Sequence, residues 1–363
     1  MPLSLQRGAR RLARLLVTVF LPITLLLAQP GGAGSAPTVK VMTRNMDAGT
    51  DLNYVLAATD DALLAQGLSD TYVEVKNSGI PVRAARLANE IAAQMPDLIG
   101  LQEVTLWRTG PLSLQPTGVS DVLYDQLDLL MTELASRKLH YSIVVTQSLV
   151  DIEVPVALQN LNLRFTDRDV ILARNDLMQS DLDLSNIQAQ RFDTLLELPL
   201  FGGLTLLRGF ESVDVNARGK TFRFFNTHLE TTDPRLPQTV RLQLAQAREL
   251  LNAARGRVPV VLLGDFNANA EPGPEHTGAV ELILAGGYLD AWHTLYPHDP
   301  GFTWPLFGED QLQGKPVQPN ERIDLIFARG LTPLSIQRLS YGLFSGPPAS
   351  DHAGVVATLQ IDR

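Results

Sequence analysis

The chain of 363 residues contains no cysteine. Disulfide bonds, thiolate nucleophiles, cysteine-ligated metals and lipid attachment through cysteine are therefore excluded. Without disulfides, the fold must be stabilised by its apolar core or by a bound ion. Hydrophobic residues make up 45% of the chain, which is ample for such a core.

Basic residues are in the minority, with 30 Lys and Arg against 39 Asp and Glu and a net charge of −9. Aromatic residues are scarce at 6%, and no run of Lys and Arg is interleaved with them. A broad nucleic-acid groove needs positive charge to neutralise phosphates, so the sequence gives no sign of an extended basic surface for nucleic acid. An acidic site can still take a phosphodiester if divalent cations supply positive charge locally.

No apolar run reaches the roughly 20 residues that a membrane-spanning helix needs. The run at 15–28 is uncharged, follows four arginines and precedes small residues. This pattern predicts an export signal over 1–36, cleaved between Ala28 and Ala36, and a secreted or periplasmic protein. An uncleaved amino-terminal membrane anchor is the alternative, because no A-x-A site is present. Without the four leader arginines the net charge of −9 becomes −13.

Apolar periodicity predicts strands and helices throughout 37–363. We expect strands at 38–46, 97–104, 141–147, 168–174, 209–229 (two strands about a turn), 260–265, 321–330 and 354–361. We expect helices at 82–95, 122–139 and 237–254, and a loop with a short helix at 51–70. A single domain over 37–363 is favoured, because the polar residues of interest spread along its whole length and need one fold to bring them together.

Polar side chains stand repeatedly where predicted strands end. Each has an ordinary structural explanation by itself, such as a cap, a turn or an ion pair, but six such positions in one chain favour a site. Asp265 and Asn267 should share one face by strand alternation, while Gly264 removes side-chain bulk beside them. The strand-end residues are Asn45, Glu103, Asn226 with His228, Asp265 with Asn267, Asp324, and Asp351 with His352.

The blocks that carry these residues, RNM, IGLQEV, NTHLE, LLGDFNA, RIDLIF and SDHAGV, resemble the signature of the endonuclease/exonuclease/phosphatase superfamily in order and spacing. The resemblance runs from about residue 38 to 359. It implies a four-layer α/β sandwich, in which two mainly antiparallel β-sheets pack face to face with helices on the outside and the site lies at one edge. It also implies a metal-dependent phosphoesterase.

Hydrolysis of a phosphate ester needs an activated water, neutralised phosphoryl oxygens and a stabilised leaving oxygen. Hard oxygen ligands suit Mg²⁺, with Mn²⁺ or Ca²⁺ as alternatives. Asn45 and Glu103 are the natural metal pair, in agreement with the resemblance, and Asp351 is a further metal contact or an orienting group.

Histidines and the remaining strand-end acids supply the proton chemistry. His352 is our first candidate for the base, with Asp324 holding its other ring nitrogen. Asp265 can orient or deprotonate the water, so the choice of base between Asp265 and His352 stays open. His228 would stabilise developing charge or protonate the leaving group.

Two asparagines complete the predicted site. Asn267 would donate to a phosphoryl oxygen, and Asn226 would line the substrate pocket beside His228. Trp292 and Trp304 are expected at the rim of that pocket.

The substrate is expected to be a phosphodiester, either in nucleic acid or in a phospholipid head group. An extracellular nuclease and a sphingomyelinase-like phosphodiesterase are close rivals; a phosphomonoesterase and a non-catalytic binding module are the alternatives. The leucine-rich stretch 194–210 is expected to form a core hairpin, with transient membrane contact as the alternative. We expect a monomer.

Overall fold

The computed structural model describes residues 36–50, 52–198, 203–273, 276–306, 317–339 and 348–362. The chain divides into two units, Met1–Ser35 and Ala36–Arg363. The expected export signal over 1–36 therefore lies, apart from its last residue, outside the described residues. Among those described, no helix combines the length and apolar character needed to cross a bilayer.

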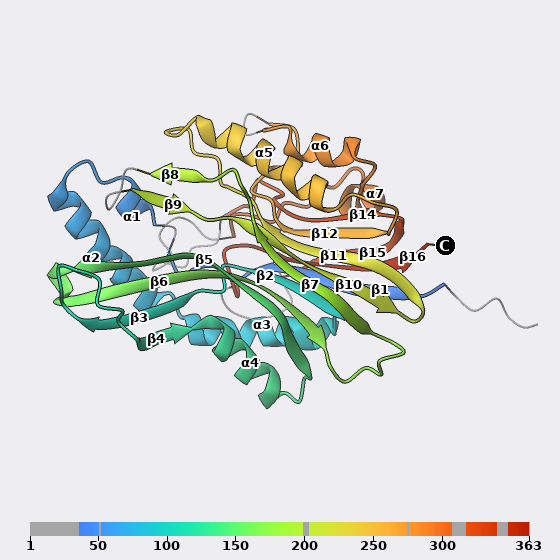
Figure 1. The fold of residues 1–363 in the computed structure, drawn as a ribbon, viewed down its shortest axis with the longest axis horizontal. Helices are drawn as coiled ribbons and strands as arrows, with labels where there is room; N and C mark the ends of the chain where they lie inside the picture. Colours follow the sequence, from blue (N-terminus) through green and yellow to red (C-terminus); the bar gives the residue numbers. More distant parts are fainter. Residues whose placement is uncertain are drawn as a thin grey trace, which may run out of the picture. The chain divides into compact units, whose positions relative to one another are not determined.

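Two large β-sheets form the framework of the second unit (Figure 1). Sheet A has the order β15-β16-β1-β2-β6-β3-β4, with β5 also paired to β6. Its strands are β1 (Thr38–Asn45), β2 (Leu98–Gln102), β3 (Leu106–Pro111), β4 (Asp121–Asp125), β5 (Tyr141–Val156), β6 (Leu161–Arg174), β15 (Leu331–Leu339) and β16 (Gly354–Ile361).

Sheet B has the order β13-β14-β12-β11-β10-β7. Its strands are β7 (Asp183–Arg191), β10 (Gly209–Ala217), β11 (Lys220–His228), β12 (Val260–Asp265), β13 (Leu289–Asp290) and β14 (Asp324–Arg329). A separate two-stranded sheet pairs β8 (Leu196–Leu198) with β9 (Leu204–Leu206). The pairs β1–β2 and β11–β12 are parallel, and the other described pairs are antiparallel.

Helices cover the outer faces of both sheets (Figure 1). Leu87 and Ile91 of α3 (Ile80–Gln94) and Leu130 of α4 (Gln126–Ser136) pack against sheet A. Leu250 of α5 (Gln238–Ala253) and Ile283 of α6 (Ala279–Ala285) pack against sheet B. A third apolar core, which includes Val41, Ile171, Phe224, Val261 and Leu263, fills the space between the sheets. The predicted sandwich of two mainly antiparallel sheets with helices outside is confirmed.

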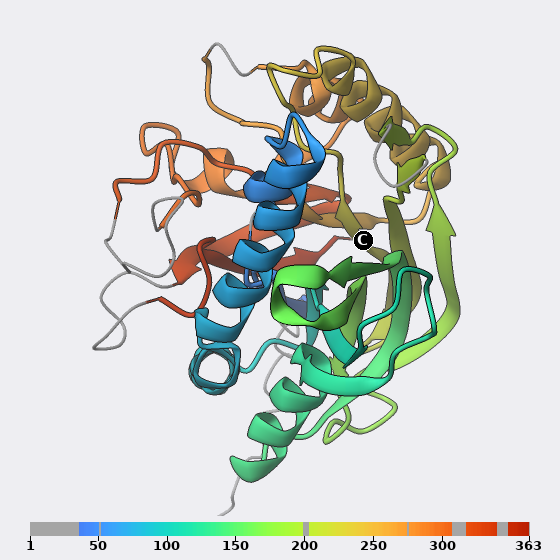
Figure 2. The ribbon, with the colours of Figure 1, turned by 90° about the vertical axis from the view of Figure 1, so that its left-hand side faces the viewer.

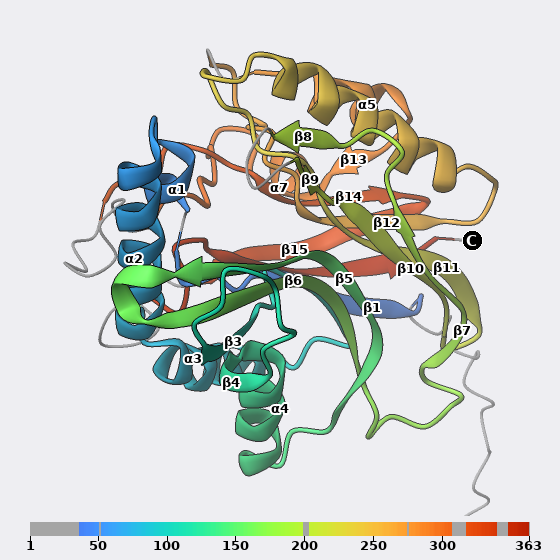
Figure 3. The same ribbon diagram turned by 60° about the vertical axis from the view of Figure 1, so that its left-hand side comes forward.

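Two further helices, α1 (Asn53–Leu56) and α2 (Asp61–Asn77), lie at one end of the sandwich (Figure 1), whereas α7 (Ala291–Leu295) packs against β14 of sheet B and β15 of sheet A. The long helix α2 runs beside the ends of β5 and β6, which are joined by the short turn Ala157–Gln159 (Figure 3). Gln159 Nε2 donates to Ser69 Oγ over 2.8 Å, so this turn is bonded directly to α2.

Two predicted elements differ from the structure for local reasons. The helix expected over 122–139 begins only at Gln126, because Asp125 caps it by accepting the N–H groups of Leu127 and Asp128, and 121–125 instead pair with β3. The stretch expected as a loop with a short helix contains most of the seventeen-residue α2, which Asp60 caps by accepting the N–H of Leu63. The weak apolar periodicity of α2 concealed its length.

Candidate functional site

The register of sheet B brings three predicted residues to one edge. His228 ends β11 directly opposite Asp265 at the end of β12, because these strands are parallel. Asp324 begins the antiparallel β14 and also pairs with Asp265. Gly264 is required here: its φ is 149°, and a Cβ would lie 1.9 Å from the carbonyl oxygen of Thr227.

Sheet A contributes a second pair at the same edge. Asn45 ends β1 opposite Gln102 in the parallel β2, and Glu103 follows with a φ of 54°. Asn45 Nδ2 lies 2.9 Å from Glu103 Oε1 and 2.9 Å from Asp265 Oδ2, so it connects the two sheets. Its Oδ1 accepts the N–H of Asp47. In this orientation the Nδ2 group of Asn45 positions the two carboxylates, and its predicted role as a metal ligand stays a prediction.

His352 is held in a charged setting. Its Nδ1 lies 2.9 Å from Asp324 Oδ2, as predicted, and its Nε2 lies 3.8 Å from Asp265 Oδ2. Burial acts to lower the pKa of His352, but the carboxylates of Asp324, Asp351 and Asp265 outweigh it and raise that pKa well above its ordinary value. His352 is therefore an imidazolium at neutral pH in this arrangement.

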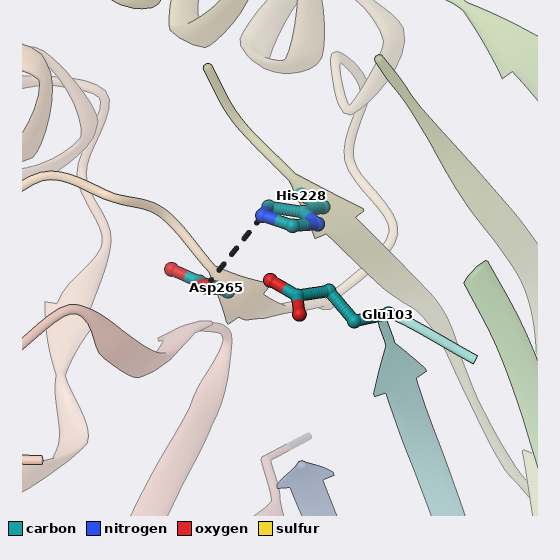
Figure 4. Close-up of side chains that lie close together, drawn as sticks. All are labelled: Glu103, His228 and Asp265. Atoms are coloured by element: carbon teal, nitrogen blue, oxygen red, sulfur yellow. Dashed lines mark ion pairs between the residues drawn. The ribbon is translucent and has the colours of Figure 1, made fainter. Parts of the chain in front are cut away.

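His228 has the opposite character. Burial and the Arg208 guanidinium lower the pKa of His228 well below its ordinary value, so this ring is neutral. Arg208 Nη1 lies 2.9 Å from Nδ1 and 3.1 Å from Nε2, and His228 Nε2 lies 3.6 Å from Asp265 Oδ2. Figure 4 shows the imidazole beside the carboxylate of Asp265, with the Glu103 side chain pointing toward both.

Glu103, His228 and Asp265 form a group that fits a divalent cation, since one ligand atom of each lies within 4.8 Å of the others. Burial and the charge of Asp351 raise the pKa of Glu103 to about 8, while burial raises the pKa of Asp265 to about 6. Buried carboxylates with raised pKa values are groups that a cation would stabilise in their charged form. Asp265, Asp324 and His352 form a second such group.

Asp351 lies beside these two groups but belongs to neither of them. Trp304 Nε1 donates to Asp351 Oδ2 over 3.2 Å, and Ser350 Oγ lies 3.3 Å from Oδ1. Both oxygens are thereby engaged, and Asp351 is in neither candidate metal group among the described residues. Of the two roles we considered, this geometry favours the orienting one.

Asn226 lies away from the cavity that it was expected to line, whereas Asn267 reaches the cavity by a route other than the expected one. Asn226 points to the same side as His228 but lies deeper between the sheets, where it accepts from Gln102 and donates to Leu101 and Glu211; it does not reach the cavity. Asn267 does line the cavity, although β12 ends at Asp265, so a turn with a φ of 47° and not strand alternation brings it there.

Arg208 is a residue that the sequence reasoning missed. It lies in the loop between β9 and β10, lines the cavity, covers His228 and forms an ion pair with Glu230 at 3.7 Å. A lone arginine inside a leucine-rich stretch was the available signal. Of the two tryptophans expected at the rim, Trp304 lines the cavity, whereas Trp292 belongs to the core between the sheets.

A cavity of 1280 Å³ opens over these groups. One end is polar and contains Glu103, Asp265, Asn267, Asp351 and His352. The other end is lined mainly by aliphatic and aromatic side chains from α1, α2, β5, β6, β8 and β9. The arrangement can bind an anionic ester at the polar end, beside a carboxylate that accepts protons and an imidazolium that donates hydrogen bonds.

The model of the endonuclease/exonuclease/phosphatase family matches residues 67–352. No curated protein shows significant similarity to the chain. Similar solved structures include an endonuclease/exonuclease/phosphatase from Beutenbergia cavernae (22% identity, 90% of this chain and 72% of that chain covered, TM-score 0.53) and one from Bacteroides vulgatus (17%, 90% and 99%, 0.54). D. rerio TDP2 complexed with single strand DNA product is also similar (18%, 89% and 98%, 0.51). At these identities the structural likeness shows the fold.

Proposed function

Because the chain belongs to the endonuclease/exonuclease/phosphatase family, whose members hydrolyse phosphoester bonds, we propose that it is an exported, divalent-cation-dependent phosphodiesterase. The observation that carries the proposal is the placement of Asp265 Oδ2. It lies 2.9 Å from Asn45 Nδ2, 3.6 Å from His228 Nε2 and 3.8 Å from His352 Nε2, at the polar end of the cavity. A bound cation, for which we expect Mg²⁺, supplies neutralising charge for the phosphoryl and leaving oxygens.

Asp265 acts as the base in this proposal. With a pKa of about 6 it is ionised at neutral pH, yet it is a better proton acceptor than an ordinary aspartate. His352 is charged, with Nδ1 held by Asp324, so its Nε2–H donates to a phosphoryl oxygen. The oxygen of the attacking water bonds to phosphorus while its proton passes to Asp265. The bond from phosphorus to the leaving oxygen breaks, and that oxygen takes up a proton from solvent water.

The test is turnover of bis-p-nitrophenyl phosphate by the exported protein, with Mg²⁺ or with EDTA. We expect turnover only with the cation, and a loss of at least about a hundredfold in Asp265→Ala and in His352→Ala. Asp121→Ala, which changes an exposed acid on β4, is the matched control and should keep wild-type turnover. Turnover that survives both site substitutions, or a folded protein inactive with Mg²⁺, Mn²⁺ and Ca²⁺, would overturn the proposal.

Export is proposed from the leader sequence alone. Mass spectrometry of the protein recovered from medium or periplasm should show an amino terminus between residues 29 and 37. Recovery of the intact chain in the membrane fraction would instead favour the anchor.

A further inference from the structure

Beside the catalytic end, the cavity continues into a space that we call the apolar chamber. One wall is formed by Leu196, Leu198, Leu204 and Leu206, and the facing wall includes Val55, Leu68, Ile152 and Phe165. Neither wall is used by the hydrolysis described above. The phosphodiester group itself needs only the polar end, so the apolar chamber can hold another part of the substrate.

The leucine wall follows from strand alternation and register. Leu196 pairs with Leu206 and Leu198 pairs with Leu204, so all four side chains point to one face of the β8–β9 sheet. Glu197 and Thr205 occupy the other face. Leu196 and Leu198 are 5% and 6% exposed, whereas Leu204 and Leu206 are half-buried, so the β9 side of this face is the more open to the cavity.

Hydrogen bonds through Trp107 and Ala48 connect the facing wall to Glu103 at the catalytic end. Trp107 Nε1 donates to the carbonyl oxygen of Ala48 over 2.9 Å, and the N–H of Ala48 donates to Glu103 Oε2 over 2.7 Å. Trp107 packs with Val55, Leu68 and other side chains of α2, β5 and β6 in one apolar cluster. In Figure 2, α2 stands beside the β5–β6 hairpin that carries the rest of this wall. Glu103 lines the same cavity as these side chains, so the apolar chamber opens directly onto the catalytic end.

The charges around the cavity oppose a polynucleotide. Among its described lining residues are eight carboxylates and two guanidiniums, those of Arg208 and Arg235. Arg235 is itself paired with Asp233 at 2.8 Å, and Arg208 with Glu230. Among these described residues, the flanking phosphates of a nucleic acid would find no spare guanidinium, and its sugars would desolvate against leucines.

We propose that the apolar chamber binds an alkyl or acyl chain of the substrate, which is therefore an amphiphilic phosphoester with its phosphate at the Asp265–His352 end. This inference rests on the proposed phosphoesterase function. The chain gains by leaving water for a preformed apolar space, and the gain grows with each methylene that the chamber covers.

The experiment measures kcat/KM for p-nitrophenyl alkyl phosphodiesters of increasing chain length, each below its micelle-forming concentration. We expect kcat/KM to rise about fourfold per added methylene until the chamber is filled. Leu204→Gln/Leu206→Gln should flatten this rise, and its circular dichroism spectrum, compared with that of the wild type, reports whether the fold is intact. Thr205→Gln, on the other face of β9, should keep the full rise. Equal kcat/KM for short and long chains in the wild type would overturn the inference.

A binding measurement separates failure of this inference from failure of the proposed function. Calorimetric titration of His352→Ala with dodecyl phosphate and with ethyl phosphate should show at least a hundredfold tighter binding of the longer chain. If no ester is hydrolysed but this preference holds, the proposed function fails and the chamber assignment stands. If both phosphates bind equally, the chamber assignment fails. Vesicles of sphingomyelin or phosphatidylcholine, compared with monomeric short-chain lipids, then show whether the chain is taken from a bilayer or from solution.

Discussion

Glu90→Leu should destabilise the protein more than removal of the whole buried ion pair to which Glu90 belongs. Arg44 Nε lies 3.1 Å from Glu90 Oε2, Arg44 Nη2 lies 3.2 Å from Oε1, and the two side chains are 0% and 2% exposed. Arg44 Nη1 also donates to the carbonyl oxygen of His352, so the pair also holds the backbone at His352 in place. Without the Glu90 carboxylate, the buried guanidinium of Arg44 has no opposing charge, and it can neither reach water nor lose its proton.

The expected magnitudes follow from that burial. Glu90→Leu should lower the free energy of unfolding by about 3–5 kcal/mol, whereas Arg44→Met/Glu90→Leu should recover most of the loss because no charge is left buried. Arg44→Met alone should cost less at low pH, because Glu90 can take up a proton. Burial already raises the pKa of Glu90 despite the opposing charge of Arg44.

The sign of the pH dependence is definite for Arg44→Met. Without the guanidinium, the pKa of Glu90 in the folded state rises further above its unfolded value. Between those two values the folded protein holds a proton that the unfolded chain has lost, so stability falls by about 1.4 kcal/mol for each unit of rising pH.

Urea denaturation followed by tryptophan fluorescence at several pH values tests this reasoning. Glu133→Gln, which breaks a half-exposed ion pair between Glu133 of α4 and Arg137 just after that helix, is the control and should cost less than about 1 kcal/mol. A loss below 1 kcal/mol in Glu90→Leu, or a double variant as unstable as that single one, would refute the assignment of a buried, uncompensated charge.

Three other predictions concern the site. The pH profile of kcat/KM should be bell-shaped, with an acidic limb near pH 6 from Asp265 and an alkaline limb from His352. The charge of Asp324 raises the pKa values of both groups, so Asp324→Asn should move both limbs to lower pH. A single acidic limb well above pH 6.5 would instead make His352 the base. Because the pKa of Glu103 is about 8, the affinity for Mg²⁺, measured by calorimetry, should increase about tenfold for each unit by which the pH rises toward 8. Glu103→Gln should abolish this slope. An affinity that does not change with pH in the wild type would contradict the prediction. Asn226→Ala should lower the free energy of unfolding, measured by denaturation, by at least about 2 kcal/mol and leave KM unchanged, because Asn226 bridges the two sheets. A raised KM in a variant of full stability would instead favour the predicted contact of Asn226 with the substrate.

Much of the site could be predicted because strand ends carry a local signal. In β12 a run of buried branched residues stops at Asp265, and in β11 buried phenylalanines give way to polar residues that end at His228, so each polar residue is visible against its own strand. The pairing of His352 with Asp324 was also expected. Asn226 was misplaced because alternation gives the face of a residue but not its depth, and depth depends on how far the other sheet extends.

The sequence by itself determined the absence of thiol chemistry, the alternation of strands and helices, and the set of acids and imidazoles that end the strands, because these depend on residue type and local periodicity. Only the tertiary structure decided that Arg208 lies against His228, that the two histidines have opposite protonation, and that four leucines of β8 and β9 face a cavity. Burial, charge proximity and cross-strand register produce these properties. All three arise from residues far apart in the chain, so no local pattern contains them.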